Sequence, residues 1–248
     1  MRLKDKIAVI TGAASGFGEG MAKRFAEEGA KVIVADLNAK GAERVASEIG
    51  AAAYPVTADV SMKADIDAMV AAAMEQHGRI DIMVNNAGYT HRNQDMLAVD
   101  EHTFDLIGAV NMKAIYHTAM AVVPIMKAQG GGCIITTAST AGLRPRPGLT
   151  WYNASKGWAI TATKSMAVEL APQKIRVNCI CPVAGDTGML AQFMGEDTPE
   201  KRAQFRASIP LGRLSTPLDI ANAALWLASE EAEFITGVAL EVDGGRCV

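Results

Sequence analysis

The chain has 248 residues, 50% of them apolar and 21% charged, and a formal net charge of −3. A chain of this length buries roughly three quarters of the surface that its unfolded form exposes, so one large domain is expected. The lack of a basic block argues against a nucleic-acid partner. Residues 1–6 lack the apolar region of a signal peptide, and no later stretch has the character of a membrane span. We therefore expect a cytoplasmic protein with no membrane partner.

The four cysteines, Cys133, Cys179, Cys181 and Cys247, show no Cys-x-x-Cys spacing, and the four histidines are scattered. Structural zinc needs clustered thiolates and imidazoles, so no metal site is predicted. Small buried thiols in a reducing compartment are the expected state of these cysteines.

Short β-branched runs alternate with helical patterns along the whole chain. We predict seven strands, at 7–10, 31–35, 53–57, 80–84, 133–136, 176–180 and 238–242. Strands that alternate with helices imply right-handed crossovers and a mostly parallel sheet with helices on both faces. The predicted fold is a Rossmann-type, doubly wound α/β domain that spans residues 1–248. The least regular stretch, about 183–215, is rich in Gly, Pro and charged residues and is predicted to be a substrate lid within that domain.

A glycine-rich run follows the first predicted strand and opens the first helix: Gly12-Ala13-Ala14-Ser15-Gly16-Phe17-Gly18. Glycines allow a tight turn and a close approach of pyrophosphate to the backbone, and the helix N-terminus offers unpaired N–H groups to phosphate. The spacing is Gly-x-x-x-Gly-x-Gly, and an ordinary strand–turn–helix junction has similar residues. Its place in a βαβ unit favours a dinucleotide site, which we assign to Gly12, Ser15, Gly16, Phe17 and Gly18.

The second predicted strand is followed by Asp36, eighteen residues beyond Gly18. A carboxylate at this point accepts hydrogen bonds from both hydroxyls of the adenosine ribose. It also repels the additional phosphate of NADP. Leu37 and Asn38 follow, so no adjacent Arg is available to hold that phosphate. A surface Asp in a turn is the alternative, but the pattern favours NAD over NADP.

Two further turns lie at the carboxyl ends of predicted strands, where ligands bind in such sheets. Asp59 and Val60 suit an adenine contact, with Asp59 accepting from the exocyclic amine. Asn86, Ala87 and Gly88 are small enough to let the backbone lie near the cofactor. Each turn would be ordinary if it occurred alone.

Ser139 stands just past the fifth predicted strand, and Tyr152 and Lys156 are four residues apart at the start of a predicted helix. This spacing places the phenol and the ammonium on one helical face. A free Tyr has a pKa of about 10, and a nearby Lys cation favours the phenolate. Such a Tyr exchanges a proton with an alcohol or carbonyl oxygen nearer neutral pH. The same pair also occurs by chance on surface helices.

Thr-Gly-x-x-x-Gly-x-Gly, Asn-Asn-Ala-Gly, a Ser thirteen residues before Tyr, and Tyr-x-x-x-Lys occur in this order over essentially the whole chain. The sequence thereby resembles the short-chain dehydrogenase/reductase family in its compact single-domain form. The resemblance implies that Tyr152 is the general acid/base, that Lys156 lowers its pKa and binds the nicotinamide ribose, and that Ser139 hydrogen-bonds the substrate oxygen. Tyr152 and Lys156 also count as cofactor contacts. Asn111, in a long central helix, matches the family Asn that holds a water for proton relay.

One departure from the family pattern follows the sixth predicted strand. The family shows Pro-Gly there and a Thr four residues after the Gly, whereas this chain has Pro182, Val183 and Thr187. The resemblance implies that this loop contacts the nicotinamide carboxamide, so Pro182 and Thr187 are expected cofactor contacts. The backbone path is left open, because Val cannot take a positive φ cheaply.

Arg144 and Arg146 lie in a proline-flanked loop before the Tyr–Lys helix. One hypothesis is that an Arg there holds a carboxylate or phosphate of the substrate. A solvated loop or a subunit contact is the alternative. In the predicted lid, Met189, Phe193 and Met194 present an adaptable apolar wall to the substrate, or simply pack within a helix.

The resulting prediction is an NAD(H)-dependent oxidoreductase that interconverts a secondary alcohol and a ketone. A 3-oxoacyl-thioester reductase is the alternative, although such enzymes mostly use NADPH and Asp36 argues against that cofactor. A cofactor-binding regulator without turnover is a more distant alternative, because the Ser, Tyr and Lys are all present. The resemblance implies a homotetramer. Two apolar stripes are wide enough for subunit contacts, or they simply pack on the sheet: Met112, Ile115, Ala119 and Val122, and Ala159, Thr163, Met166 and Leu170.

Overall fold

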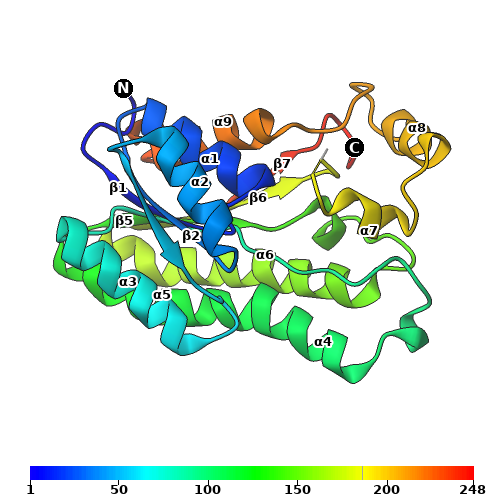
Figure 1. Ribbon diagram of the computed structural model, residues 1–248, viewed down its shortest axis with the longest axis horizontal. Coiled ribbons are helices and arrows are strands. Elements are labelled where there is room, and N and C mark those ends of the chain that lie inside the picture. Colours follow the sequence, from blue (N-terminus) through cyan, green and yellow to red (C-terminus); the bar gives the residue numbers. More distant parts are fainter. Residues whose placement is uncertain (186) are drawn as a thin grey trace.

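Seven strands form one sheet in the computed structural model, which describes residues 1–185 and 187–248 (Figure 1). The strands are β1 (Ile7–Thr11), β2 (Lys31–Asp36), β3 (Ala53–Thr57), β4 (Ile82–Asn85), β5 (Gly132–Thr137), β6 (Ile175–Pro182) and β7 (Ala239–Val242). Their order is β3-β2-β1-β4-β5-β6-β7, and every neighbouring pair is parallel. The predicted fold class is confirmed. Each predicted strand is present with ends that shift by at most two residues, and the sheet is wholly rather than mostly parallel.

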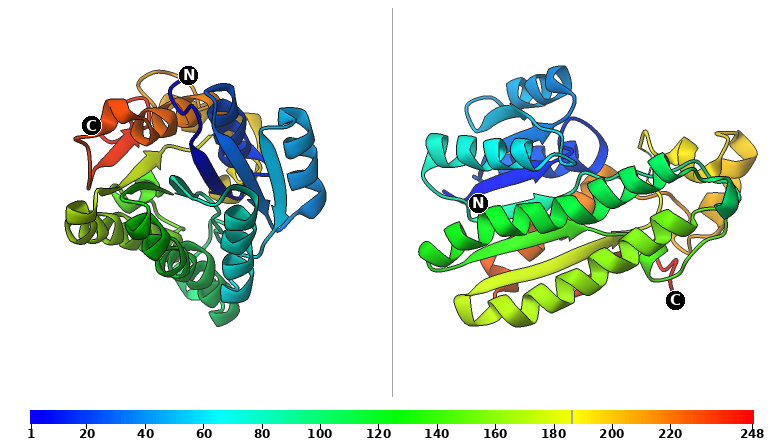
Figure 2. Two further views of the ribbon diagram at one scale, coloured as in Figure 1. Left: turned by 90° about the vertical axis from the view of Figure 1, so that its left-hand side faces the viewer. Right: turned by 90° about the horizontal axis from the view of Figure 1, so that it is seen from below.

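Helices connect the strands and cover both faces of the sheet (Figure 2). They are α1 (Gly16–Glu27), α2 (Ala39–Ile49), α3 (Lys63–His77), α4 (Glu101–Gly108), α5 (Ala114–Ala128), α6 (Thr150–Leu170), α7 (Leu190–Met194), α8 (Pro199–Ala207) and α9 (Pro217–Ala228). The helices α1, α2 and α9 pack on one face, and α3, α5 and α6 pack on the other. Because both faces are covered, β1 is buried at all five positions and needs no alternation of apolar and polar residues.

A π-helical segment, Ala109–Lys113, joins α4 directly to α5. Among the described residues, the resulting stretch Glu101–Ala128 is long and apolar enough to cross a membrane by length and composition alone, contrary to the expectation from the sequence. In the fold, one side of it packs against α3 and the sheet and buries Val122 and Met126, while Tyr116 is exposed. The inner side of this stretch is thus part of the core.

The carboxyl ends of the parallel strands meet at one edge of the sheet, and the strand order reverses between β1 and β4. Ligands bind in the crevice at this point in open parallel sheets. The segment predicted as a lid, 183–215, lies beyond that edge and contains α7 and α8 (Figure 1). Asp186, within it, lies outside the described residues. The predicted site residues at the strand ends therefore converge with this segment.

Candidate active site

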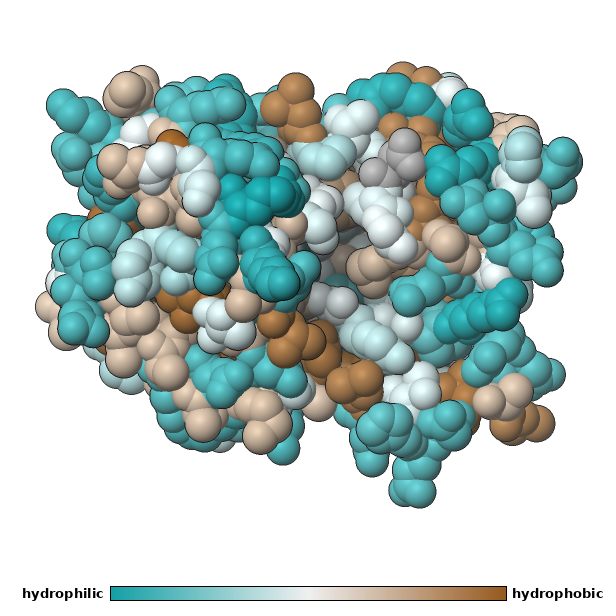
Figure 3. All heavy atoms as spheres, viewed as in Figure 1, coloured by the Kyte–Doolittle hydropathy of each residue, from teal (hydrophilic) through white to brown (hydrophobic). Residues whose placement is uncertain are grey.

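A cavity of about 580 Å³ opens beyond the carboxyl edge of the sheet, and the surface is hollowed there between the α1–α2 side and the lid segment (Figure 3). That volume is typical of a site for a small molecule. Most of the residues predicted from the sequence line it: Gly12, Ser15, Gly16, Phe17, Asp36, Asp59, Val60, Asn86, Ala87, Gly88, Ser139, Arg146, Tyr152, Lys156, Pro182, Thr187 and Met189.

Three predicted residues do not line the cavity. Gly18 is buried at the start of α1, and a Cβ there would lie 2.1 Å from the Gly12 carbonyl oxygen, so glycine is what lets helix and loop touch. Asn111 is buried behind the cavity wall. Arg144 is exposed and donates to the Arg246 carbonyl oxygen at 3.0 Å. Each of the three would therefore act on a bound ligand only through neighbouring residues.

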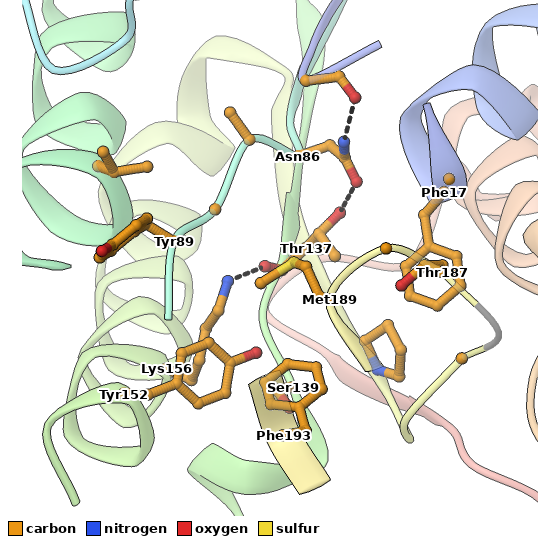
Figure 4. Close-up of a pocket in the computed structure, with 18 of the residues that line it drawn as sticks. Phe17, Asn86, Tyr89, Thr137, Ser139, Tyr152, Lys156, Thr187, Met189 and Phe193 are labelled. Carbon is orange, nitrogen blue, oxygen red and sulfur yellow. Dashed lines mark hydrogen bonds between the residues drawn. The ribbon is translucent and has the colours of Figure 1, made fainter. Parts of the chain in front are cut away.

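Asn86 ties three strand ends together beneath the cavity (Figure 4). Its Nδ2 donates to the carbonyl oxygens of Thr11 (2.9 Å) and Gly12 (3.2 Å), and its Oδ1 accepts from Thr137 Oγ1 (3.2 Å). Thr11 Oγ1 accepts in turn from the backbone N–H groups of Asn86 and Ala87, at 3.0 and 3.1 Å. The sequence patterns assign neither threonine to the site, although a Thr directly before the glycine run is a visible signal. The loop shape thus depends on side chains that bond backbone groups.

The glycine loop approaches the end of β4 closely. Gly12 has a φ of +64°, and a Cβ there would lie 2.9 Å from the Cα of Ala87, so only glycine fits. Ser15 follows as the N-cap of α1 and makes no side-chain cap hydrogen bond, which leaves its hydroxyl exposed at the cavity. A helix N-terminus with a free hydroxyl beside it suits a phosphate group.

Asp36 is the last residue of β2, and each of its carboxylate oxygens accepts a hydrogen bond from one backbone N–H. Its Oδ2 accepts from Ala14 and its Oδ1 from Asn38, both at 2.9 Å. Asp59, after β3, accepts from the N–H (2.9 Å) and the hydroxyl (2.7 Å) of Ser61 through Oδ1. A carboxylate accepts about four hydrogen bonds. Both side chains therefore hold their local backbone and keep acceptor capacity for hydroxyl or amine groups of a ligand.

Tyr152 and Lys156 lie one turn apart in α6, and each is 5% exposed. Lys156 Nζ donates to the Thr137 carbonyl oxygen at 2.8 Å and lies 5.7 Å from the centroid of the Tyr152 ring (Figure 4). Ser139 is the N-cap of a short 3₁₀ turn after β5, and its Oγ accepts from the Ala141 N–H at 3.1 Å. The Ser139 hydroxyl can still donate its own proton at the cavity wall that it shares with the Tyr–Lys pair.

Burial shifts both ionisable groups toward their neutral forms. Desolvation raises the pKa of Tyr152 to about 12, while a side-chain hydrogen bond with Ser139 and the charge of Arg146 act to lower it. Burial lowers the pKa of Lys156 to about 8. The spacing predicts that Lys156 lowers the pKa of Tyr152, but in the structure the lowering comes from Ser139 and Arg146, and burial outweighs it.

Asn111 lies in the π-helical segment between α4 and α5 and is 2% exposed. Its Nδ2 donates to the Tyr89 carbonyl oxygen (2.8 Å) and to Ser155 Oγ (2.9 Å), and its Oδ1 accepts from the Tyr89 N–H (2.8 Å). It thereby fixes the chain after β4 to α6, with one lone pair of Oδ1 left. π-bulges are frequent at functional sites, and the helical pattern of the sequence does not reveal this one.

Val183, where the chain departs from the family pattern after β6, lies in unstrained backbone. Val183 is buried, its φ is not positive, and its N–H donates to the Val242 carbonyl oxygen at 3.4 Å. Pro182 and Thr187 line the cavity on either side of it. Val183 fits here because the path needs no left-handed residue.

Another part of the cavity wall is built of large side chains. Met189 and Phe193 of the lid segment and Phe205 of α8 line it together with Arg146. The rings of Phe193 and Tyr152 lie 5.3 Å apart between centroids (Figure 4). No signal in the sequence marks Phe205, in the middle of a charged helix, as a cavity residue.

The class of protein follows from the way these two parts meet. A glycine loop at the switch point of a parallel sheet suits a dinucleotide. A Ser and a Tyr–Lys pair on the same cavity suit proton exchange with an alcohol or carbonyl oxygen. Together they are typical of a Rossmann-type oxidoreductase.

Comparisons with known proteins point to the same class. The family model described as Enoyl-(Acyl carrier protein) reductase matches residues 12–246. The chain is 50% identical to 4-formylbenzenesulfonate dehydrogenase of Comamonas testosteroni and 41% identical to galactitol 2-dehydrogenase of Agrobacterium fabrum, over 99% of each chain in both cases. It superimposes on the crystal structure of 3-ketoacyl-(acyl-carrier-protein) reductase from Brucella melitensis complexed with NADH with a TM-score of 0.95. The identity there is 51%, over 99% of this chain and 100% of that one.

The chain belongs to the short-chain dehydrogenase/reductase family, which confirms the resemblance found in the sequence. It is an oxidoreductase that uses a nicotinamide cofactor to interconvert alcohols and carbonyl compounds, as predicted. These relatives are named as enzymes, which sets aside a regulator without turnover. Their names differ in substrate.

Proposed function

We propose that the enzyme interconverts a secondary alcohol and a ketone with NAD(H) as its cofactor and Tyr152 as the general acid/base. The observation that carries the proposal is that Ser139, Tyr152 and Lys156 line the same cavity as the glycine loop. In this proposal residues 1–248 act as one domain, and 183–215 form the lid over the site.

Tyr152 exchanges the proton at the substrate oxygen. In ketone reduction its phenol donates that proton, and in alcohol oxidation its phenolate accepts it. With a pKa of about 12, Tyr152 is almost wholly protonated at neutral pH, so its phenol is present for reduction, whereas oxidation needs the scarce phenolate, which the positive charge of Arg146 favours. The Ser139 hydroxyl donates to the same substrate oxygen and stabilises the charge that develops there.

Lys156 and Asn111 support this exchange. With a pKa of about 8, Lys156 is mostly protonated at neutral pH and still able to release a proton. A Cβ on Gly88 would lie 3.5 Å from Lys156 Nζ and 3.6 Å from Asn111 Oδ1, so the two groups flank one point beside the cavity. We assign to Asn111 a water, held by the remaining lone pair of Oδ1, through which Lys156 exchanges protons with solvent.

The cofactor supplies or accepts the hydride when bound. The cradle of glycines and the acceptor capacity of the strand-end carboxylates fit a dinucleotide. Lys156 binds the nicotinamide ribose in addition to its proton role. The residues that would hold the cofactor are Gly12, Ser15, Gly16 and Phe17 at the pyrophosphate with Gly18 behind them, Asp36 at the adenosine ribose, Asp59 and Val60 at the adenine, and Asn86, Ala87, Gly88, Tyr152, Lys156, Pro182 and Thr187 along the nicotinamide half.

The preference for NAD over NADP rests on the charge of Asp36. A phosphate on the adenosine ribose would meet this carboxylate at short range, which costs several kcal/mol. Arg44 donates to the Ala14 carbonyl oxygen of the glycine loop at 3.0 Å, but Glu19 and Glu48, each at 2.8 Å, already compensate its charge. The B. melitensis relative is complexed with NADH, which supports the same preference.

Turnover of the purified enzyme, followed at the nicotinamide absorbance, tests the proposal. NAD and NADP are compared against polyols, sugars, hydroxy acids and 3-hydroxyacyl thioesters. We expect preference for NAD and activity on one alcohol class.

The matched variant is Tyr152→Phe, which keeps the ring contact with Phe193 and removes only the hydroxyl. Its kcat should fall by roughly 10²- to 10⁴-fold, while the Kd for NADH should rise by no more than about threefold, because only one of the proposed cofactor contacts, the Tyr152 hydroxyl, is lost. Activity that survives this substitution would overturn the role of Tyr152, and preference for NADP would overturn that of Asp36.

A 3-oxoacyl-thioester reductase is the second candidate. The observation that favours it is the 51% identity to the B. melitensis protein, which is described as a 3-ketoacyl reductase and is complexed with NADH. Asp36 therefore does not by itself argue against that activity. A kcat/KM for acetoacetyl thioester reduction above that of every simple ketone would establish this candidate in place of the first.

We further infer that four copies of the chain associate through the outer sides of α5 and α6, which lie side by side on one face of the sheet (Figure 2). Most residues of the apolar stripes predicted from the sequence, such as Val122 and Ala159, are buried in the core and are not available for this contact. The exposed residues are Tyr116 and Met120 on α5 and Trp158 and Val168 on α6, at 38–79%. Such apolar surface is typical of contacts between subunits. Light scattering should give four times the chain mass of 26.1 kDa, and a monomer at micromolar concentration would refute the assembly.

The cytoplasm is the proposed compartment. All four cysteines are free thiols and three of them are buried, which fits a reducing environment. Recovery of the protein in a secreted or membrane fraction of its host would contradict this assignment.

A further inference from the structure

Arg146 is held in place at the cavity wall. Its side chain is partly buried, and its guanidinium carbon lies 4.8 Å from the centroid of the Phe205 ring. Its own carbonyl oxygen accepts from Nδ2 of Asn153, a buried residue that follows Tyr152 in α6, at 2.8 Å. Prolines on both sides restrict the loop. The backbone at Arg146 is thus fixed relative to the helix that carries Tyr152, and the Phe205 ring positions the guanidinium.

This guanidinium has no anionic partner in the part of the chain that the structure describes. The groups whose charge acts on it are Arg246, Cys247 and Tyr152, and the first is itself a cation. Burial and the charge of Arg246 both lower the pKa of Arg146, although an Arg stays protonated in proteins. Arg176, by contrast, is also partly buried and donates to three backbone carbonyl oxygens. A partly desolvated cation without a partner is unfavourable, and a bound anion would relieve that cost.

The cavity wall around Arg146 and the reacting groups is apolar. Leu149, Met189 and Phe193 line it together with Phe205. The charge of Arg146 lowers the pKa of Tyr152, so the cation and the phenol act on the same part of the cavity. A ligand that satisfies all of these groups has a carbonyl at the Tyr, an apolar body against the rings, and a negative group at the Arg.

We propose that Arg146 binds an oxyanion of the substrate, so that the enzyme acts on alcohols and ketones that carry a carboxylate or a sulfonate beyond an apolar body. A guanidinium offers a planar fork of N–H donors that pairs with two oxygens of such a group. In an apolar wall this pairing is stronger than in water. The inference rests on the proposed function for the position of the reacting carbonyl. It assigns the role to Arg146 and not to Arg144, which is exposed and bonded to a backbone carbonyl oxygen.

The test uses three ketones that differ only in the para group: 4-acetylbenzoate, 4-acetylbenzenesulfonate and the neutral 4-acetylbenzamide, each reduced with NADH. In Arg146→Ala, kcat/KM for the two anions should fall by about 10- to 100-fold, mainly through KM, and that for the amide by less than about threefold. Arg146→Lys keeps the positive charge but not the planar fork of donors, so its loss of kcat/KM for the anions should be smaller than that of Arg146→Ala. Arg144→Ala removes an equal charge from the same loop and should change all three by less than about twofold.

Binding measured without turnover separates this inference from the proposed function. Calorimetry with 4-acetylbenzoate and 4-acetylbenzamide on NADH-loaded Tyr152→Phe protein should show tighter binding of the anion, lost in the double variant with Arg146→Ala. If no ketone is reduced but this Arg-dependent binding persists, the proposed function fails and the inference stands. Binding of 4-acetylbenzamide as tight as that of 4-acetylbenzoate would refute the inference. The inference would also be refuted if Arg146→Lys, with unchanged thermal unfolding, lost kcat/KM equally for the anions and for the amide.

Discussion

Two parts of the cavity wall are built differently. At the strand ends the wall consists of small residues and backbone groups, and the polar side chains of Asp36 and Asn86 are largely engaged in holding that backbone. In the loop before α6 and in the lid segment, the wall consists of the large side chains of Arg146, Phe193 and Phe205. Ring contacts, rather than hydrogen bonds of the side chains, position these three.

The difference indicates where the enzyme tolerates change. A wall of tightly packed backbone cannot be altered without moving several strand ends, whereas side chains on loops and short helices are exchanged more freely. Relatives of 41–51% identity are named for a sulfonated aldehyde, a polyol and an acyl-carrier thioester. Substitutions at the strand ends are therefore expected to damage cofactor use or stability, and those at the loop and lid to change the substrate.

The largest effect at the strand-end wall should come from Asp36→Asn. Loss of the charge removes the repulsion of the additional phosphate, so the ratio of kcat/KM for NADP to that for NAD should rise by roughly 10²-fold or more. The amide also loses one of the two backbone hydrogen bonds to Ala14 and Asn38, so activity with NAD should fall. Parallel rates with both cofactors give the ratio. Glu43→Gln, an exposed acid of α2 away from the cavity, controls for net charge, and a ratio equal to that of this control would mean that Asp36 does not select the cofactor.

A smaller, steric effect should come from Gly18→Ala. The added Cβ would lie 2.1 Å from the Gly12 carbonyl oxygen and 2.6 Å from Asn86 Nδ2. We expect a loss of about 2–3 kcal/mol in the free energy of unfolding in urea, with weaker NADH binding. Gly108→Ala, in α4 with nothing within 4 Å of the added Cβ, should be neutral or gain about 0.5 kcal/mol. Equal stability of the two variants would show that the strand-end wall accommodates the additional methyl group without strain.

The same contrast explains what the sequence could predict. The seven strands, the glycine loop and the Tyr–Lys pair depend on neighbours within one βαβ unit or one helical turn, so local patterns reveal them. The hydrogen bond between Asn86 and Thr137 joins residues 51 positions apart, and the contact of Arg146 with Phe205 depends on the docking of α8. The direction of the pKa shift of Tyr152 depends on burial, to which packing of Phe193 contributes. Spacing along the chain carries no information about such distant packing.

Lys156 lies at the cavity wall together with the residues of both parts, and its burial predicts a pH dependence of stability. Its pKa is about 8 in the folded protein and about 10.4 in an unfolded chain. Between these values the unfolded chain binds more protons, so the free energy of unfolding rises with pH. The free-energy cost of burying the ammonium applies in full only below about pH 8, where Lys156 is protonated in the folded protein as well as in the unfolded chain.

Lys156→Met should remove this dependence. Relative to the variant, the wild type should gain about 2 kcal/mol in the free energy of unfolding between about pH 7.5 and 9.5. The window ends there because the raised pKa of Tyr152 acts in the opposite direction from about pH 10 to 12. In the variant the Thr137 carbonyl oxygen loses its hydrogen-bond donor. This loss lowers the free energy of unfolding by the same amount at every pH, so it does not change the pH dependence. Urea unfolding over a series of pH values measures the difference, with Lys164→Met, at an exposed lysine of the same helix, as the control. If the free energy of unfolding of the wild type rises with pH no more steeply than that of Lys156→Met, the ammonium is hydrated in the folded protein. Water would then reach the point where the strand-end part of the cavity wall meets the part built of large side chains.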